Sequence, residues 1–406
     1  MDYGKLFHKE CAFQRETFQQ RMDEFGFKNM ARMELFLWDL ELFLHIQKIL
    51  GDKIVLKGGA ATQFYLPREV QRTSVDIDML FFGTEEEITD ALNKMEKLLG
   101  TEEGLFKFRK HTPKNPRTNL PLHTYYTDIP SILTGAERNV KEEEYPHQEL
   151  KIEFILQPEK WEYEKRTGEH IFAVESHWEY QVLPLNYLFA DKLTTLGCET
   201  IGVQNDRLDE QVKQFYDIMM LTRYGLPQLD CSAVKEKYLN RAEQEWDVRK
   251  KTPGTFIENK EYDQKCIVED VRKQLLRYAR ADSGDDFELK QFINSFYSLY
   301  LNRKVQYDPK TVACKASLIG LMYELMLNDQ GWDKVEQALS IEEKLGMNHL
   351  TGKEKGQKIR EIRDAMIQKF GECSVIPAKT LKGKDLRRVF WAIVNADNLD
   401  EIEGMI

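Results

Sequence analysis

The pattern of apolar and polar residues predicts an α/β protein, with helices at both ends and short strands between them. Residues 35–50 are apolar on most sides of the expected helix, which is typical of a helix buried in a core. Short apolar runs predict buried strands at 54–56 and 75–82, and the run 150–156 predicts a third. From about residue 230 onward, apolar residues recur three or four positions apart, which predicts a mostly helical C-terminal region.

Local signals add detail between these elements. Thr84 is a good N-cap for a helix that runs to Gly100, and three glutamates follow it in the first turn. Residues 123–127 and 131–133 have strand character. Gly225-Leu226-Pro227 ends a helix, so we expect a domain boundary near residue 228.

Two aspartates give the strand at 75–82 a chemical role. Successive strand side chains point to opposite faces, so Asp76 and Asp78 lie close together on one face. Two neighbouring carboxylates repel each other unless a cation or a proton lies between them. Mg²⁺ suits this position because it takes oxygen ligands and is often shared with substrate phosphates. An exposed strand end carrying two ordinary acids is the structural alternative.

Gly58 and Gly59 directly follow the first strand. Glycines allow a backbone to come close to a phosphate and to offer it N–H groups. A simple turn is the alternative for such a pair. Beside the Asp-x-Asp strand, the pair is better explained as part of a nucleotide site.

Five short motifs follow one another in an order that resembles the AbiEii/AbiGii toxin family, within the polymerase-β-type nucleotidyltransferase superfamily. The resemblance covers about residues 30–225. The motifs are Lys57-Gly58-Gly59, Arg72-x-Ser74-x-Asp76-Ile77-Asp78, Glu153 on its strand, Asp191-Lys192-Leu193, and Tyr216-Asp217-Ile218. The sequence departs from the family pattern at Ala60, where Thr or Ser is usual, and at Gln214, where an acid often stands.

The resemblance implies a fold and a set of site residues. We expect a small mixed sheet flanked by helices over 51–228, N-terminal helices over 1–50 that pack on it, and a helical domain over 229–406. Two Mg²⁺ ions are implied, with Mn²⁺ as an alternative. The implied catalytic residues are Asp76, Asp78, Glu153, Lys192 and Asp217; the implied nucleotide-binding residues are Lys57, Gly58, Gly59, Ser74 and Lys192; the implied metal ligands are Asp76, Asp78 and Glu153.

Three of these residues have a structural alternative. Glu153 can be the cross-strand partner of a lysine rather than a metal ligand. Lys192 lies within an apolar helical stripe, and a buried ammonium needs an anion, which is either an internal carboxylate or a triphosphate. Asp217 either faces the cleft or pairs with a basic side chain. The neighbouring Asp191 points elsewhere on the helix, so we expect it to be solvated.

The resemblance implies NTP-dependent nucleotidyl transfer to an acceptor hydroxyl. RNA, in particular tRNA, is the implied acceptor, and the implied setting is a growth-inhibiting toxin or phage-defence effector with a cognate antitoxin. A small-molecule or protein acceptor is one alternative. A nucleotide-binding module without turnover is another.

Composition limits the remaining possibilities. The net charge of −10 is no general nucleic-acid signature, so RNA would have to bind local basic segments, of which 107–117 and 353–388 are the candidates. Six scattered cysteines show no zinc-ligand spacing and favour a reducing cytoplasm. The sequence contains neither an apolar run of membrane-spanning length nor the pattern of a signal peptide.

Overall fold

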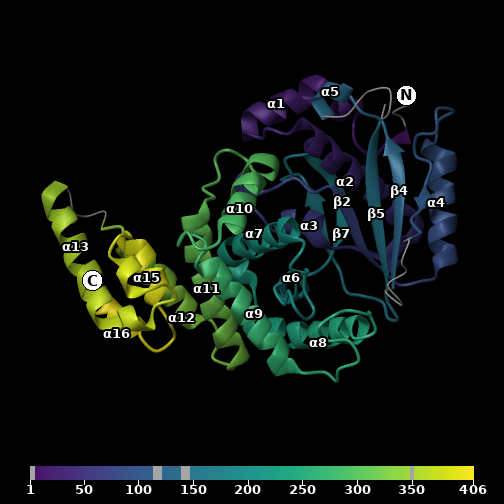
Figure 1. Cartoon of the computed structure of the whole chain (residues 1–406). Helices are drawn as coiled ribbons and strands as arrows, with labels where there is room; N and C mark the ends of the chain where they lie inside the picture. Colours follow the sequence, from purple (N-terminus) through teal and green to yellow (C-terminus); the bar gives the residue numbers. More distant parts are fainter. Residues whose placement is uncertain (1–4, 113–120, 139–146, 348–351) are drawn as a thin grey trace.

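The computed structural model of the chain describes residues 5–112, 121–138, 147–347 and 352–406. A seven-stranded mixed sheet flanked by helices forms one end of the molecule, and helices form the other (Figure 1). This confirms the predicted α/β class. The strands are β1 (Ile54–Leu56), β2 (Asp76–Phe81), β3 (Arg109–Lys110), β4 (Leu122–Ile129), β5 (Gln148–Leu156), β6 (Glu164–Gly168) and β7 (Ser176–Val182).

The strand order is β3-β4-β5-β2-β1-β7-β6. The pairs β2–β5 and β1–β7 are parallel, and the other neighbours are antiparallel. Because β2 and β5 are neighbours, the strand with the two aspartates lies directly beside the strand with Glu153.

The helices are α1 (Arg15–Phe25), α2 (Met30–Leu50), α3 (Gly58–Gln63), α4 (Glu85–Leu99), α5 (Gly135–Arg138), α6 (Leu185–Thr194), α7 (Leu208–Gly225), α8 (Cys231–Arg249), α9 (Gln264–Ala279), α10 (Phe287–Tyr300), α11 (Pro309–Leu327), α12 (Asp333–Lys344), α13 (Gly352–Phe370), α14 (Ala378–Leu381), α15 (Leu386–Ile393) and α16 (Leu399–Glu403). Thr84 caps α4 as predicted, in a capping box with Glu87. No described helix is both long and apolar enough to cross a membrane.

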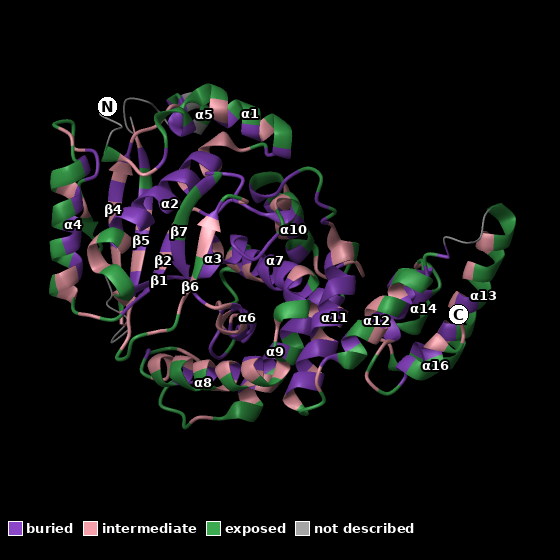
Figure 2. Ribbon diagram, turned by 180° about the vertical axis from the view of Figure 1, so that it is seen from behind, coloured by how far each residue is buried: buried purple, intermediate pink, exposed green. Residues whose placement is uncertain are grey.

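Helix α2 is buried along most of its length against the sheet, as its apolar pattern predicts (Figure 2). On the strand beside it, Ile77, Met79 and Phe81 are buried and alternate with Asp76 and Asp78. The alternation leaves one face of β2 for the core and the other for charged chemistry.

Two strand predictions need correction. Residues 131–133 are not a strand, because β4 ends at Ile129 and the N–H of Ile132 donates to the carboxylate of Glu34 at 2.8 Å. Strands β6 and β7 are absent from the sequence-based prediction. β7 nevertheless carries a readable signal, since Trp178, Tyr180 and Val182 alternate with polar residues.

The division of the chain at residue 228 stays a prediction. Helix α8 begins just after this position and packs against α6, which precedes it. The two predicted parts are therefore in direct contact.

The basic segment 353–388 does not form one surface. Arg388 is 0% exposed and donates to both carboxylate oxygens of Asp282, at 2.9 and 3.0 Å. Lys384 also pairs with Asp282, at 2.8 Å. The expectation that Arg388 contributes to an RNA surface is therefore wrong, because its guanidinium is a structural ion in the protein interior.

Asp39 of α2 is a buried acid in this core. Its side chain is 1% exposed, and neither carboxylate oxygen has a hydrogen-bond partner in the described part of the chain. Burial, reinforced by the charges of Asp76 and Asp78, raises the pKa of Asp39 well above its ordinary value. There is therefore a pH range in which Asp39 is neutral in the folded protein and ionised in the unfolded chain.

This difference predicts a pH-dependent effect of Asp39→Asn. A raised folded-state pKa means that stability is lost as pH rises above the ordinary pKa of the acid. The neutral amide removes this loss, so the variant should gain stability over the parent as pH increases above the ordinary pKa of about 4. Thermal melts across this range measure the gain. A difference in melting temperature that does not vary with pH would contradict the interpretation.

Candidate active site

Three predicted acids meet on one face of the sheet. In the parallel register of β2 and β5, Asp78 lies beside Glu153 and Asp76 lies beside Lys151. Glu153 accepts a hydrogen bond from Thr124 of β4 at 3.1 Å and pairs with Lys151 at 3.0 Å. The structural alternative for Glu153, a lysine partner, is thus present, on the same strand rather than across strands.

Burial and neighbouring charges perturb the pKa values of the acids on this face. Burial, with the nearby charges of Glu153 and Asp76, raises the pKa of Asp78 to about 8. Burial also raises the pKa of Asp76, although Lys151 opposes the shift. Burial lowers the pKa of Lys151, but the carboxylates of Asp76 and Glu153 more than offset this, so it is raised. Lys213 also lowers the pKa of Asp76 and Lys57 that of Asp78, so Lys151 is one of three lysines whose charge acts on these acids.

Asp76 and Asp78 provide the oxygen donors that Mg²⁺ prefers, and Mg²⁺ commonly uses one or two carboxylates together with substrate phosphates. Within the described residues, no group of three or more His, Cys, Asp or Glu side chains is placed to hold a metal ion, so Asp76, Asp78 and Glu153 do not form such a group as they stand. The two aspartates therefore fit a cation whose remaining ligands come from substrate and water. Glu153 would have to leave Lys151 to join them.

The glycine pair lets α3 approach β2 closely. Gly58 has a φ of +70°, and a Cβ atom there would lie 2.3 Å from Oδ2 of Asp78. A Cβ atom on Gly59 would lie 2.4 Å from Nη2 of Arg72 and 3.1 Å from Oγ of Ser74. Ser74 is buried. The structure thus brings the glycines and Ser74 to the acid pair, and it gives the glycines a packing role besides any contact with phosphate.

A buried ion network lies next to these glycines. Arg72 donates from Nε and Nη2 to the two carboxylate oxygens of Asp217, each at 2.7 Å. Lys192 pairs with Asp217 at 2.8 Å and donates to Gln214 at 2.6 Å. Asp217 is 0% exposed; burial raises its pKa, but Arg72 and Lys192 outweigh this and hold it below the ordinary value. Lys192 thus has an internal carboxylate as its partner.

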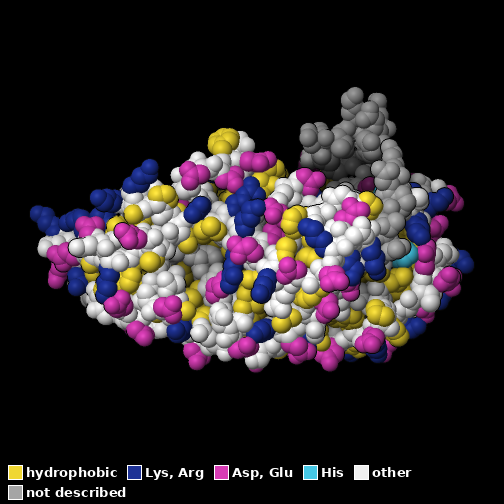
Figure 3. All heavy atoms as spheres, turned by 60° about the horizontal axis from the view of Figure 1, so that its bottom comes forward, with side chains coloured by type: hydrophobic (Ala, Val, Ile, Leu, Met, Phe, Trp, Pro, Cys, Tyr) yellow, Lys and Arg dark blue, Asp and Glu magenta, His cyan; other side chains and the backbone are white. Residues whose placement is uncertain are grey.

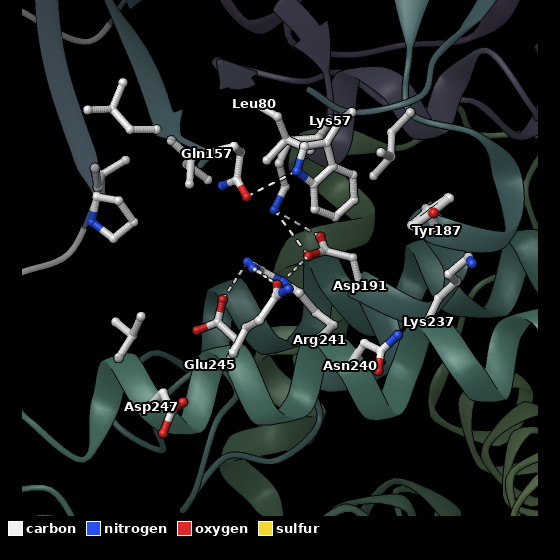
Figure 4. Close-up of a pocket in the computed structure, with 18 of the residues that line it drawn as sticks. Lys57, Leu80, Gln157, Tyr187, Asp191, Lys237, Asn240, Arg241, Glu245 and Asp247 are labelled. Atoms are coloured by element: carbon white, nitrogen blue, oxygen red, sulfur yellow. Dashed lines mark hydrogen bonds and ion pairs between the residues drawn. The ribbon is translucent and has the colours of Figure 1, made fainter. Parts of the chain in front are cut away.

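Asp191 is not a solvated surface acid, which corrects the sequence-based expectation. Its carboxylate accepts from Lys57 at 3.1 Å and from Nε of Arg241 at 3.0 Å, and Arg241 also binds Glu245 (Figure 4). Burial raises the pKa of Asp191, but Lys57 and Arg241 lower it to about 2. This cluster joins the strand end of β1 to α6 and α8.

A cavity of about 1050 Å³ opens beside the acids. Its wall includes Leu80 and Ile155, the next residues on the same strand faces as Asp78 and Glu153. The cavity is bounded further by the segment 156–162, by α6, by residues 202–207 and by α8, and Lys57 and Asp191 line it. Asp76, Asp78 and Glu153 are not themselves among the residues that line the cavity, which lies next to them along the same two strands.

Comparison with protein-family models identifies one match. Residues 42–297, more than half of the chain, match the model described as the nucleotidyl transferase AbiEii toxin of type IV toxin–antitoxin systems. The chain belongs to the AbiEii family. This AbiEii-family chain is thus a nucleotidyltransferase of a toxin–antitoxin type, which implies an NTP substrate and an antitoxin partner.

Two solved structures are similar to the AbiEii-family chain at low identity. JHP933 from Helicobacter pylori is 14% identical, with a TM-score of 0.37 over 82% of this chain and 98% of that one. The nucleotidyltransferase toxin MenT4 from Mycobacterium tuberculosis is 11% identical, with a TM-score of 0.37 over 68% of this chain and 92% of that one. A search of curated proteins finds no match.

Some residues of this site are absent from the sequence-based assignment. Arg72 belongs to the motif that contains Asp76 and Asp78. Its partner Asp217 lies 145 positions away in the sequence, so the motif does not indicate this bond. Lys151 could have been found as the neighbour of Glu153 on the same strand face. Arg241 carries no sequence signal, since it belongs to an ordinary charged helix.

Proposed function

We propose that this AbiEii-family chain transfers a nucleoside monophosphate from an NTP to a hydroxyl of RNA, with tRNA as the expected substrate. The observation that supports this proposal is the pair Asp76 and Asp78, beside Glu153, on the sheet face that continues into the cavity. In the reaction, the acceptor oxygen forms a bond to the α-phosphorus, and pyrophosphate leaves with the electrons of the broken P–O bond.

Each site residue has a proposed role. Asp76 and Asp78 would hold Mg²⁺, or Mn²⁺, as a pair of ions; the bound metal supplies positive charge for the attacking and leaving oxygens. Glu153 takes the proton of the attacking hydroxyl or joins the metal ligands. Lys57 lines the cavity and can meet a phosphate, while Gly58 and Gly59 offer backbone N–H groups.

Lys192 is proposed to stabilise the charge that develops on the leaving pyrophosphate. Lys192 is only 1% exposed, and its ammonium contacts Asp217 and Gln214. To play this role, Lys192 must either act through its contacts with Asp217 and Gln214 or release one of them to bind the pyrophosphate. Ser74, which is also buried, would support Gly59 rather than reach the substrate directly.

In the first candidate RNA segment, two of the three described cations are paired with acids, and Lys107 is exposed. Arg109 pairs with Asp128 and Glu149, and Lys110 pairs with Glu85. Lys114 and Arg117 lie outside the described residues. The second segment offers a better surface, since Lys353, Lys358 and Arg360 of α13 are exposed, and Figure 3 shows Lys and Arg side chains gathered at that end of the molecule.

Charge reversal on α13 tests this surface. We expect Lys353→Glu, Lys358→Glu and Arg360→Glu together to weaken RNA binding and to make its salt dependence shallower by roughly one unit per lost phosphate contact. NTP binding should not change. Lys94→Glu with Lys97→Glu on α4, at the opposite end of the molecule, is the control. Equal RNA affinity of the α13 variant and the parent at several salt concentrations would exclude α13 as the RNA surface.

A small-molecule or protein acceptor is the alternative. Three cavity cations favour it, because Lys57, Arg241 and Arg249 are already paired with acids and therefore offer little positive charge to a nucleic acid. Salt-independent transfer to a non-RNA acceptor would support this alternative. Growth arrest on expression, relieved by a co-expressed antitoxin and absent with Asp78→Asn, would test the proposed action in cells.

A further inference from the structure

Two aromatic rings line the cavity beside the acid face. Trp161 follows β5, and Tyr187 belongs to α6; their ring centroids are 5.3 Å apart in an edge-to-face arrangement. Neither side chain is fully buried, but Nζ of Lys237 lies over the ring of Tyr187, 4.7 Å from its centroid. Aromatic rings that remain accessible inside a cavity are suited to stack against a flat ligand, because every nucleobase has a π-face.

Uncharged amides line the same cavity. They come from the end of β5, from the loop before α7 and from α8, and they are Gln157, Gln204, Asn240 and Gln244. Gln157 accepts the indole N–H of Trp161 at 3.1 Å through Oε1, and no hydrogen bond of its Nε2 is found among the described residues. Asn240 projects from α8 with its amide exposed (Figure 4). Amides of this kind donate and accept together, as recognition of a base edge requires.

We propose that this cavity binds a nucleobase, with Trp161 as the stacking residue and Gln157 and Asn240 as contacts to the base edge. The inference rests on the proposed function, which brings a nucleotide to this site. Lys57 and Arg241 line the same cavity but are both paired with Asp191, so the inference rests on the aromatic ring and the amides. The volume of about 1050 Å³ leaves room for a base together with its sugar and phosphates.

The base belongs either to the incoming NTP or to the RNA end that accepts it. Binding experiments without turnover separate these sources. The probes are the four α,β-methylene NTP analogues and short RNA oligonucleotides that end in each of the four nucleotides. Titration calorimetry of the full chain measures the dissociation constant for each.

Trp161→Ala should weaken binding of one probe class roughly ten-fold, the loss expected from one base–aromatic stack. Trp161→Phe keeps a stacking ring and should restore most of the affinity. Trp178→Ala is the matched control, because Trp178 is 38% exposed, lies on β7 and does not line the cavity. If Trp161→Ala loses affinity for the NTP analogues, the base belongs to the NTP. If it loses affinity for the oligonucleotides, the base belongs to the acceptor.

Asn240→Leu tests the edge contacts at an exposed helical position. It should change the ratio of affinities among the four bases by several-fold while leaving the melting temperature as in the parent. The inference is overturned if Trp161→Ala and Asn240→Leu bind every probe like the parent, or if the parent itself shows no base preference. Transfer by Asp78→Asn is measured separately, so loss of the nucleobase site and failure of the proposed chemistry give different results.

Discussion

Asp78→Asn should reduce nucleotidyl transfer by about a hundred- to a thousand-fold or more, because the amide cannot supply the charge that holds a metal beside Asp76. The folded protein should not lose stability. Burial and neighbouring acids raise the pKa of Asp78 to about 8, so the carboxyl is mostly protonated in the metal-free fold near neutral pH. Since the unfolded chain is ionised there, this acid costs stability as pH rises from its ordinary pKa towards about 8.

The variant therefore combines lost activity with an unchanged or higher melting temperature. Turnover is measured from labelled NTP, and melts are recorded with a chelator across the same pH interval. Asp90→Asn is the control, because Asp90 is an exposed acid on α4. Full activity of Asp78→Asn would mean that the acid pair is not the reaction centre. A large fall in stability would mean that the carboxylate is a structural partner instead.

Asp217→Ala should destabilise the protein by about 3–5 kcal/mol, the cost of leaving buried charges without their partner. Asp217 has no exposed surface and holds both Arg72 and Lys192. Lys192→Met should cost less, because Asp217 keeps the two hydrogen bonds from Arg72. Denaturant unfolding of the parent and both variants gives the free energies.

The same pair of variants separates the two roles of Lys192. If Lys192→Met remains folded and loses most transfer, the lysine acts on the substrate charge. If its melting temperature falls markedly and the remaining activity follows the folded fraction, the lysine is structural. An Asp217→Ala protein as stable as the parent would contradict the buried-network account altogether.

The sequence was most informative where one strand carries its own chemistry. The alternation of Asp76 and Asp78 with Ile77 and Met79 predicts a charged and an apolar face, and the structure shows both. Glu153 was predicted on a strand able to lie beside them, and the register places it next to Asp78. Both results follow from the two-residue period of a strand, which is local information.

Long-range ion pairs were much less predictable. The sequence allows either a carboxylate or a triphosphate as the partner of Lys192, and the fold supplies Asp217 from another helix. Asp191 was expected in solvent because its position on α6 differs from that of Lys192. It is instead enclosed by Lys57 and by Arg241 of α8, a helix placed by contacts that no local pattern encodes.

The most direct test of the central claim is incubation of the protein with each labelled NTP and total RNA, with and without Mg²⁺. The account predicts that label from at least one NTP enters RNA, that pyrophosphate is released, and that both signals disappear with chelator or with Asp78→Asn. Failure to label RNA from any NTP in the presence of Mg²⁺, or equal labelling by the Asp78→Asn protein, would contradict it.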